Sequence, residues 1–277
     1  METVVITGAS DGVGAAAAAQ LKVKGYNVVI VGRSPVKTEA LARDLDVSFH
    51  IADFSRLDDV RRLAAELDRH DRIDVLANNA GGIMGPRQVT IDGYEKTFQV
   101  NHLAPFLLTR LLLPKLIASK AKVIQTASNA PNFFKSELFD ATDLNCERSY
   151  APETAYGLAK LENILFTREL ARRHGKDGIS AVAFHPGIVR SNFASETTHF
   201  VRFIYRAPLK YLITISPKVA AREFVDLVEG KPGVDWQPGE IYAKGKPMRL
   251  KFKDESGETA RRLWERSEQM LKSREFS

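Results

Sequence analysis

Short apolar runs alternate with helical patterns along much of the chain, and each run has the length of a β-strand. Six runs read as strands: TVVITG, NVVIVG, VSFHIAD, IDVLANNAG, AKVIQTAS and ISAVAFHPG. The spacing of apolar positions between them predicts helices over residues 15–23, 38–45, 57–69, 103–117 and 155–173. Strands that alternate with helices pair in parallel through right-handed crossovers, and near-continuous apolar strands fit a sheet covered on both faces. The pattern predicts an α/β fold, a doubly wound parallel sheet of about seven strands with helices on both faces.

One domain accounts for residues 1–277, because no linker, low-complexity stretch or solenoid repeat interrupts the alternation. Two segments fall outside the regular rhythm: 129–154 is polar and aromatic, and 194–215 is aromatic and basic. Both follow strands at their carboxyl ends, where ligands bind in open parallel sheets. We expect 194–215 to form a substrate lid and 244–277 to form a C-terminal extension. Within the lid, aromatic side chains alternate with cations over 199–213, so a membrane-surface patch stays open as the alternative.

Composition narrows the class of protein without naming it. Apolar residues make up 44% of the chain and charged residues 27%, as in ordinary globular proteins. The single cysteine, Cys146, allows no intramolecular disulfide and no cysteine-based zinc cluster, so we expect no metal and a reducing, cytoplasmic setting. No basic leader precedes the first strand. The most apolar helix-length run, 102–116, is interrupted by two prolines and an arginine, so stable membrane insertion is not expected, while peripheral association stays open.

The formal net charge of +6 raises the question of a nucleic-acid partner. Lysine and arginine are spread along the chain and interleaved with acidic residues, without the dense basic stripe and interleaved aromatics of a nucleic-acid surface. Local excesses at 202–210 and 244–253 read as solvated faces. We therefore expect a small-molecule partner and no nucleic acid.

A glycine-rich loop, TGASDGVG, joins the first strand to the first helix. Its glycines allow a tight turn and close backbone approach, and the helix N-terminus offers free N–H groups and a positive dipole end to a pyrophosphate. This is the context of a dinucleotide-binding Rossmann fold. The residues expected to bind the cofactor here are Gly8, Ser10, Asp11, Gly12, Val13 and Gly14.

The end of the second strand indicates which dinucleotide is bound. A carboxylate at that position would bind a ribose 2′-hydroxyl and repel a 2′-phosphate, but the chain has Arg33 and Ser34 there, with Lys37 close behind. Arginine makes paired hydrogen bonds to phosphate, and serine adds another. The sequence predicts NADP(H) rather than NAD, with Asp11 in the glycine loop as a mild counter-signal.

Tyr156 and Lys160 stand four residues apart in YGLAK, on a predicted helix, and therefore lie on one helix face. A free tyrosine titrates near about pH 10 and is a poor base at neutral pH. A neighbouring cation favours the phenolate and lowers the tyrosine pKa toward a useful range. Taken alone, the pair is more often a solvated helix face than an acid–base couple.

With the glycine loop and this pair, the chain resembles the short-chain dehydrogenase/reductase family over nearly its whole length. The other motifs are NNAG at 78–81, Asn101 in FQVNHLAPF, Ser128 after the fifth strand and Pro186-Gly187 after the sixth. The resemblance implies that Tyr156 exchanges a proton with a carbonyl or alcohol oxygen and that Ser128 hydrogen-bonds the same oxygen. It also implies that Lys160 binds the nicotinamide ribose and lowers the Tyr156 pKa, and that Asn101 positions a water linking Lys160 to solvent.

Further cofactor contacts follow from the same resemblance. It implies that Asp53 contacts the adenine, that Asn79 and Gly81 line the adenosine ribose, and that 187–191 lie along the nicotinamide. The family usually has threonine at Ser191, where serine keeps the hydroxyl. The cofactor-binding residues expected beyond the two loops are Asp53, Phe54, Asn79, Ala80, Gly81, Tyr156, Lys160, Pro186, Gly187, Val189 and Ser191.

Within the family, the chain is most similar to the retinol dehydrogenase subgroup. The phrases that carry this similarity are NHLAPFLLTRLLLPKL, AYGLAKLENILFTRELARR, HPGIVRSNF and ARRLWERSEQML, together with the wide gap between Ser128 and Tyr156. It implies an NADP-dependent oxidoreductase for a lipophilic aldehyde, ketone or alcohol, whose pocket could include Ile83, Met84, Phe133, Phe134 and Phe193. Reduction of a carbon–carbon double bond and a non-catalytic NADP sensor are the alternatives.

The oligomeric state stays open between monomer and homodimer. The helices at 103–117 and 156–173 could form a four-helix dimer contact, or the C-terminal extension could cover them. His102 and His185 are expected to be packed rather than catalytic.

Overall fold

A single mostly parallel sheet organises the protein, whose computed structural model describes residues 1–134, 139–189 and 214–273. The strands are β1 Thr3–Thr7, β2 Asn27–Gly32, β3 Ser48–Ile51, β4 Val75–Asn78, β5 Lys122–Thr126, β6 Ser180–Phe184, β7 Ile241–Ala243 and β8 Lys246–Pro247. They lie in the order β3-β2-β1-β4-β5-β6-β7-β8, and only β8 is antiparallel to its neighbour. The predicted doubly wound Rossmann-type fold is confirmed.

The chain reverses its direction across the sheet between β1 and β4, because β2 and β3 lie on one side of β1 and the later strands on the other. Residues on β1 face both neighbours, as Ile6 does between Ile30 and Ala77. The loops after β1 and β4 diverge at this point, which is where open parallel sheets bind their ligands.

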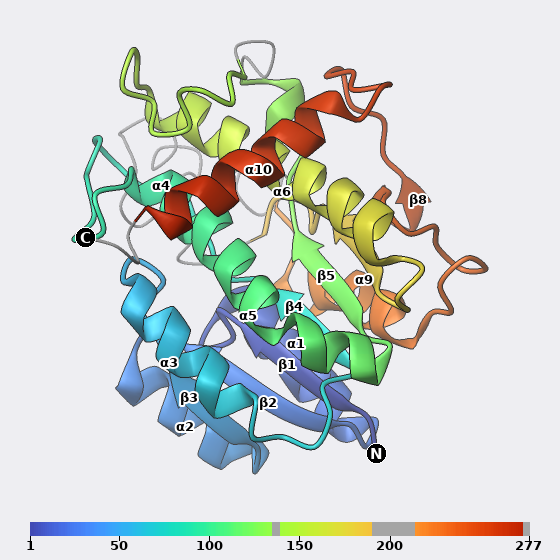
Figure 1. Cartoon of the computed structure of the whole chain (residues 1–277). Helices are drawn as coiled ribbons and strands as arrows, with labels where there is room; N and C mark the ends of the chain where they lie inside the picture. Colours follow the sequence, from blue (N-terminus) through green and yellow to red (C-terminus); the bar gives the residue numbers. More distant parts are fainter. Residues whose placement is uncertain (135–138, 190–213, 274–277) are drawn as a thin grey trace.

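Helices cover both faces of the sheet (Figure 1). The first layer holds α1 Gly12–Val23, α2 Pro35–Leu45 and α9 Pro217–Glu229, and the second holds α3 Leu57–Leu67, α4 Lys96–Phe98, α5 Ala104–Ser119 and α6 Pro152–His174. Alternate strand residues face opposite layers: Val4 packs with the α1 and α9 side, while Val5 packs with the α3, α5 and α6 side. Both are fully buried, as the near-continuous apolar strands predicted.

The helix predicted over 103–117 begins earlier and contains an irregular turn. Glu95 caps α4 by accepting from Thr97 N and Phe98 N at 2.9 and 2.8 Å, and the helix then continues to Ser119. Between α4 and α5 the segment Gln99–Leu103 (η1) is a π-helix, in which the Ala104 N–H reaches back five residues to the Gln99 carbonyl. One extra residue is thereby inserted into a buried helix, a feature frequent at functional sites.

The C-terminal helix α10, Glu258–Lys272, lies on α6 and α5 (Figure 1). It covers these two helices, for which the sequence left either a dimer contact or the C-terminal extension as the covering element. Trp264, only 2% exposed, stacks on Phe166 of α6 at 5.7 Å and meets Phe106 of α5 edge-on at 5.0 Å. At the rim, Arg110 of α5 pairs with Glu268 at 2.9 Å. Within the described residues, the C-terminal extension therefore occupies the surface that a four-helix dimer contact would use.

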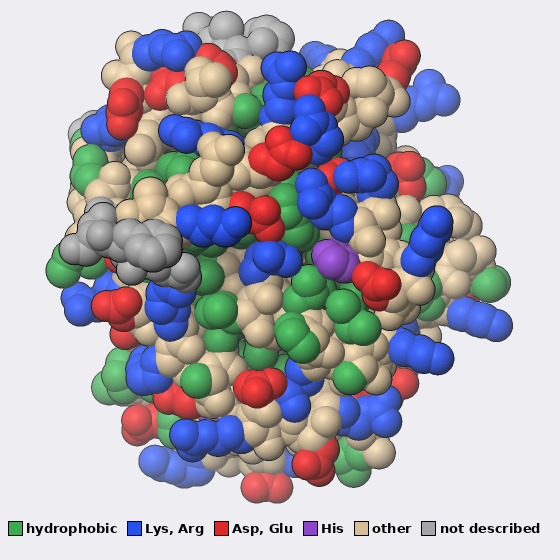
Figure 2. Space-filling view, viewed as in Figure 1, with side chains coloured by type: hydrophobic (Ala, Val, Ile, Leu, Met, Phe, Trp, Pro, Cys, Tyr) green, Lys and Arg blue, Asp and Glu red, His purple; other side chains and the backbone are tan. Residues whose placement is uncertain are grey.

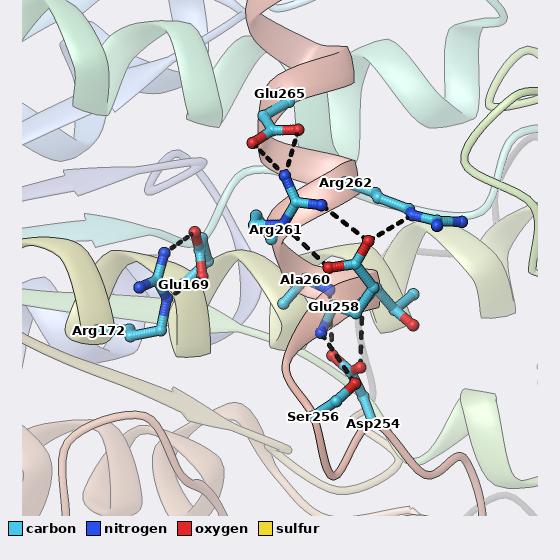
Figure 3. A network of polar contacts seen from close by, with 10 residues as sticks. Glu169, Arg172, Asp254, Ser256, Glu258, Ala260, Arg261, Arg262 and Glu265 are labelled. Carbon is cyan, nitrogen blue, oxygen red and sulfur yellow. Dashed lines mark hydrogen bonds and ion pairs between the residues drawn. The ribbon is translucent and has the colours of Figure 1, made fainter.

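Polar contacts fix the two ends of α10. Asp254 accepts from the backbone N–H groups of Thr259 and Ala260, both at 3.0 Å, and so caps the first turn (Figure 3). At the other end, the Tyr94 hydroxyl donates to the Met270 carbonyl at 2.5 Å. On this side of the molecule, lysine and arginine are interspersed with acidic side chains (Figure 2). Among the described residues, no helix is long and apolar enough to span a bilayer.

A short helix, η2, Ala130–Asn132, follows β5 and packs against α6. Most of the predicted lid over 194–215, namely residues 194–213, lies outside the described residues. The extension from 244 begins at a tight turn between β7 and β8, in which Lys244 adopts a left-handed φ of +53°.

Candidate active site

The glycine loop folds tightly against the segment after β4. Gly8 has a φ of +64°, and a Cβ on it would lie 2.6 Å from the Ala80 Cα, so no other residue fits there without a backbone shift. A Cβ on Gly14 would lie 2.7 Å from Asn79 Nδ2. Asp11 caps α1 by accepting from Gly12 N at 2.7 Å. The loop thus brings the N-terminus of α1 to the switch point, where it offers N–H groups to a phosphate.

Asn79 locks three strand ends together through its side chain. Its Nδ2 donates to the Thr7 and Gly8 carbonyls at 3.0 and 3.3 Å, and its Oδ1 accepts from Thr126 Oγ1 at 3.0 Å. The side-chain NH₂ group is therefore used inside the protein, and so is the backbone N–H, which donates to Thr7 Oγ1 at 3.0 Å, so a contact from Asn79 to a cofactor would use an oxygen.

A cleft of about 200 Å³ opens between these loops. Residues that the sequence predicted for the cofactor and that line the cleft are Gly8, Ser10, Arg33, Asp53, Phe54, Ala80 and Gly81. Lining residues that sequence reasoning missed or placed elsewhere are Val31, Gly32, Ala52, Gly82, Ile83, Met84 and Val100. Most are immediate neighbours of predicted residues. Including every residue at the carboxyl end of each predicted strand would therefore have found them.

The end of β2 carries the predicted selector of the cofactor. Arg33 is exposed and directly follows the buried Gly32. Ser34 caps α2 by accepting from Lys37 N at 3.4 Å, and Lys37 is exposed in the first turn of that helix. Neither Arg33 nor Lys37 forms an ion pair with any residue that the structure describes. Asp53, across the cleft, accepts from Ser55 N and Oγ at 2.9 and 2.8 Å.

Tyr156 and Lys160 occupy one face of α6, as their spacing predicted. Tyr156 is 6% exposed and Lys160 is 2% exposed, and the Lys160 Nζ lies 5.6 Å from the centre of the tyrosine ring. Nζ donates to the Thr126 carbonyl at 2.9 Å. Burial lowers the pKa of Lys160 to about 7, because the ammonium has lost most of its hydration.

Asn101 sits in the π-helix and is fully buried. Its Nδ2 donates to the carbonyls of Gly82 and Thr97 at 3.0 and 2.9 Å, and its Oδ1 accepts from Gly82 N at 3.0 Å. A Cβ on Gly81 would overlap Asn101 Oδ1 and lie 3.2 Å from Lys160 Nζ. The motif after β4, the π-helix and α6 therefore meet at one point.

Ser128 follows β5 by two residues, and its Oγ accepts from Ala130 N at 3.1 Å. The loop that holds it lies against the start of α6: a Cβ on Gly157 would be 2.8 Å from the Phe134 Cβ. The neighbouring Phe133 is 71% exposed. The serine, the tyrosine and an apolar surface thus gather at the carboxyl edge of the sheet.

The last predicted cofactor segment follows β6. Gly187 has a φ of +82°, and Val189 forms a parallel bridge with Ile215. Burial lowers the pKa of His185, just before Pro186, to about 4, with a further contribution from Lys244, so this histidine is neutral. Ser191 and Phe193 lie outside the described residues.

The residues described include no group of three or more histidine, cysteine or acidic side chains that could hold a metal. The chemistry that this arrangement offers is proton transfer by a buried phenol–ammonium pair beside a phosphate-binding loop.

Comparison with known proteins identifies the family to which this site belongs. The short chain dehydrogenase family model matches residues 2–138. Retinol dehydrogenase 13 from Homo sapiens is 35% identical over 282 residues, covering 98% of this chain and 84% of its own length. A crystal structure of an uncharacterised protein from Mycobacterium paratuberculosis is 31% identical, covers 98% of this chain and 94% of its own, and superposes with a TM-score of 0.75.

Two more distant structures share the fold and contain a nicotinamide cofactor. A short-chain dehydrogenase from Sphingobium yanoikuyae in complex with NADPH is 23% identical, with 82% and 85% of the two chains covered and a TM-score of 0.63. A 3-ketoacyl-(acyl-carrier-protein) reductase from Brucella melitensis complexed with NADH is also 23% identical, with 82% and 90% covered and a TM-score of 0.63. The chain belongs to the short-chain dehydrogenase/reductase family and is an oxidoreductase that acts on an alcohol or carbonyl group with a nicotinamide cofactor.

Proposed function

We propose that this enzyme uses NADP(H) to interconvert a lipophilic aldehyde or ketone and its alcohol, with Tyr156 as the general acid and base. The observation that carries the proposal is that Asn101 and Lys160 both lie against Gly81, which lines the cleft. Lys160 is one helical turn from Tyr156 on α6. A cofactor that enters between the glycine loop and Gly81 would end at the acid–base pair.

The residues present fit a dinucleotide. The N-terminus of α1 supplies N–H groups for the pyrophosphate, and the glycines hold the backbone close enough for contact. Arg33 and Lys37 are exposed cations without a described ion-pair partner, beside the position that a 2′-phosphate would take. When bound, the nicotinamide supplies or accepts the hydride.

Tyr156 transfers the proton that accompanies the hydride. In reduction its hydroxyl donates to the carbonyl oxygen, and in oxidation the phenolate accepts the alcohol proton. Ser128 donates a hydrogen bond to the same oxygen and fixes its position. Lys160 favours the phenolate through its charge, and the Thr126 carbonyl keeps that ammonium directed at the site.

A lipophilic substrate is supported by two observations. The surface next to Ser128 is apolar, because Phe134 packs on the start of α6 and Phe133 is largely exposed beside it. The similar retinol dehydrogenase 13 is named for an apolar alcohol.

The proposal is tested by following NADPH consumption with a panel of aldehydes, ketones and quinones, and by identifying the products. Wild-type protein should form alcohols, and Tyr156→Phe should lose about a hundredfold or more in turnover. Tyr26→Phe, at the opposite edge of the sheet, is the matched control and should keep full activity. Unchanged turnover in Tyr156→Phe would overturn the mechanism, and a saturated ketone as product would replace it with carbon–carbon double-bond reduction.

A further inference from the structure

A buried polar path leads from the C-terminal helix toward the catalytic lysine. It begins at Ser267 of α10, which is fully buried, and at His102 of the π-helix, which is 1% exposed. The His102 Nε2 and the Ser267 Oγ are 3.0 Å apart. Both groups lie in a layer that is otherwise aromatic: the histidine ring is 5.6 Å from Phe98 and 6.1 Å from Phe166. A polar pair in such surroundings is costly unless it is hydrogen-bonded.

His102 is neutral in the folded protein. Burial lowers its pKa to about 3, and Asn163 of α6 opposes that shift as a hydrogen-bonding neighbour. No charged side chain contributes to the pKa of His102. A neutral imidazole has one donor nitrogen and one acceptor nitrogen, so its two partners must differ in kind. A serine hydroxyl can donate to Nε2, which leaves Nδ1 with the proton.

Asn163 provides an acceptor on the other side of the ring. Its Oδ1 and the His102 Nδ1 are both buried without a hydrogen-bond partner within 3.5 Å among the described residues, although the two side chains are neighbours. Buried groups of complementary type are seldom left unpaired, so we expect the His102 Nδ1–H to donate to the Asn163 Oδ1. The Asn163 Nδ2 in turn lies 3.5 Å from the Thr126 carbonyl, which also accepts from Lys160.

We propose that Ser267, His102 and Asn163 form a hydrogen-bonded bridge that positions Asn101 and Lys160, making α10 part of the support of the active site. The serine hydroxyl donates to Nε2, and Nδ1–H donates to Asn163 Oδ1. His102 adjoins Asn101 in the π-helix, and Asn163 shares the Thr126 carbonyl with Lys160. The three are positioning residues, since none touches the reacting atoms. The test of this bridge rests on the proposed function, because it measures the pH dependence of turnover with Tyr156 as the general acid and base.

The bridge predicts an effect on the pH profile as well as on rate. In Ser267→Ala, Lys160 is held less firmly beside Tyr156 and stabilises its phenolate less. For alcohol oxidation we expect turnover to fall about fivefold to tenfold, the change that one lost hydrogen bond produces. In the pH profile of kcat/KM, the rising limb should move to higher pH by about half a unit. Burial lowers the pKa of Lys160 itself to about 7.

Controls separate positioning from packing. Trp264→Phe loosens the same helix without touching the polar path. It removes an indole N–H that has no hydrogen-bond partner among the described residues, so it should lower the melting temperature and leave the pH profile in place. Ser273→Ala, exposed at the end of α10, should change neither. Asn163→Leu breaks the path from the other side, and combined with Ser267→Ala it should cost little more than the larger single effect.

The outcomes are distinct. A shifted limb in Ser267→Ala and Asn163→Leu, with an unshifted limb in Trp264→Phe, supports the bridge. An unshifted limb in both polar variants, or an equal shift in Trp264→Phe, overturns it. If Tyr156→Phe is inactive while the polar variants are normal, only the bridge fails; if Tyr156→Phe is active, the proposed function fails as well.

Discussion

Replacing Arg33 with alanine should change the cofactor preference without changing the fold. The side chain is exposed, follows the buried end of β2, and has no ion pair within the described part of the chain. Its removal therefore breaks no internal contact that the structure records, and any change in binding reports on the ligand. Ser34 is a poorer target, because its hydroxyl caps α2 and alanine there would also weaken the helix.

The size of the effect follows from charge and exposure. Two unit charges about 4 Å apart attract by about 1 kcal/mol in bulk water and by about 4 kcal/mol at a protein surface. A phosphate carries more than one charge near neutral pH, which increases the attraction, but solvent and salt screen an exposed arginine. A net loss of about 2 kcal/mol for NADPH is consistent with a charge-assisted hydrogen bond and corresponds to about a thirtyfold weaker Kd.

The assay is a pair of Kd values, for NADPH and for NADH, measured by calorimetry or cofactor fluorescence at low and high salt. Arg33→Ala should weaken NADPH about thirtyfold and leave NADH within about twofold. Lys37→Ala should weaken NADPH by about threefold, since lysine is a point charge farther along the helix. Arg43→Ala, exposed in the last turn of α2, is the control and should change neither value. Equal weakening of both cofactors, or NADH binding as tightly as NADPH to wild type, would refute the assignment.

Four further predictions concern stability, geometry and assembly. Burial, and then a neighbouring carboxylate, raise the pKa of Glu162 well above its ordinary value, so the stability of the wild-type protein falls as the pH rises past that ordinary value. The melting temperature of Glu162→Gln, measured relative to wild type, should therefore increase from about pH 5 to about pH 8. A decrease would contradict this. Although burial opposes the shift, hydrogen bonds from two arginines lower the pKa of Glu169. Glu169→Gln should therefore be less stable than wild type at about pH 5 and at about pH 8, and the difference in stability should disappear only below about pH 4. Gly81→Ala should fold by circular dichroism yet lose about a hundredfold in turnover, because its Cβ would overlap Asn101 beside Lys160; retained turnover would disprove that meeting point. Because α10 covers α5 and α6, light scattering should give the 30.8 kDa of one chain, and a dimer that survives charge substitutions on α10 would show that another surface is used.

Sequence reasoning predicted the features that depend on local pattern. The six predicted strands were recognised from their apolar runs, and the glycine loop, Arg33, the 78–81 motif and Ser128 each follow one of them, so the position of these loops could be predicted together with the strands. The short strands β7 and β8, of three and two residues at one end of the sheet, are too brief to produce a period. The π-helix was missed as well, because its segment Gln99–Leu103 buries polar and apolar residues alike and so shows no helical period.

Features that depend on distant partners were beyond the pattern. Trp264 lies in a helix whose other side is charged, and nothing local reveals that its ring fills the space between Phe106 and Phe166. Asn79 was expected to contact the adenosine ribose, but only the fold shows that its amide is occupied by Thr7, Gly8 and Thr126. The expectation of a packed His102 agrees with its burial, and its partner Ser267 is 165 residues away.

The close approaches around the glycine loop divide the dinucleotide cleft into a fixed half and an adjustable half. At Gly8 and Gly14 any side chain would collide with the segment after β4, and both N–H groups of the Asn79 amide already donate to the glycine loop. At Arg33 and Lys37 the side chains project from the surface and can vary without disturbing the core. A library meant to exchange the two cofactors should therefore vary residues 33–37 and keep the glycine loop fixed.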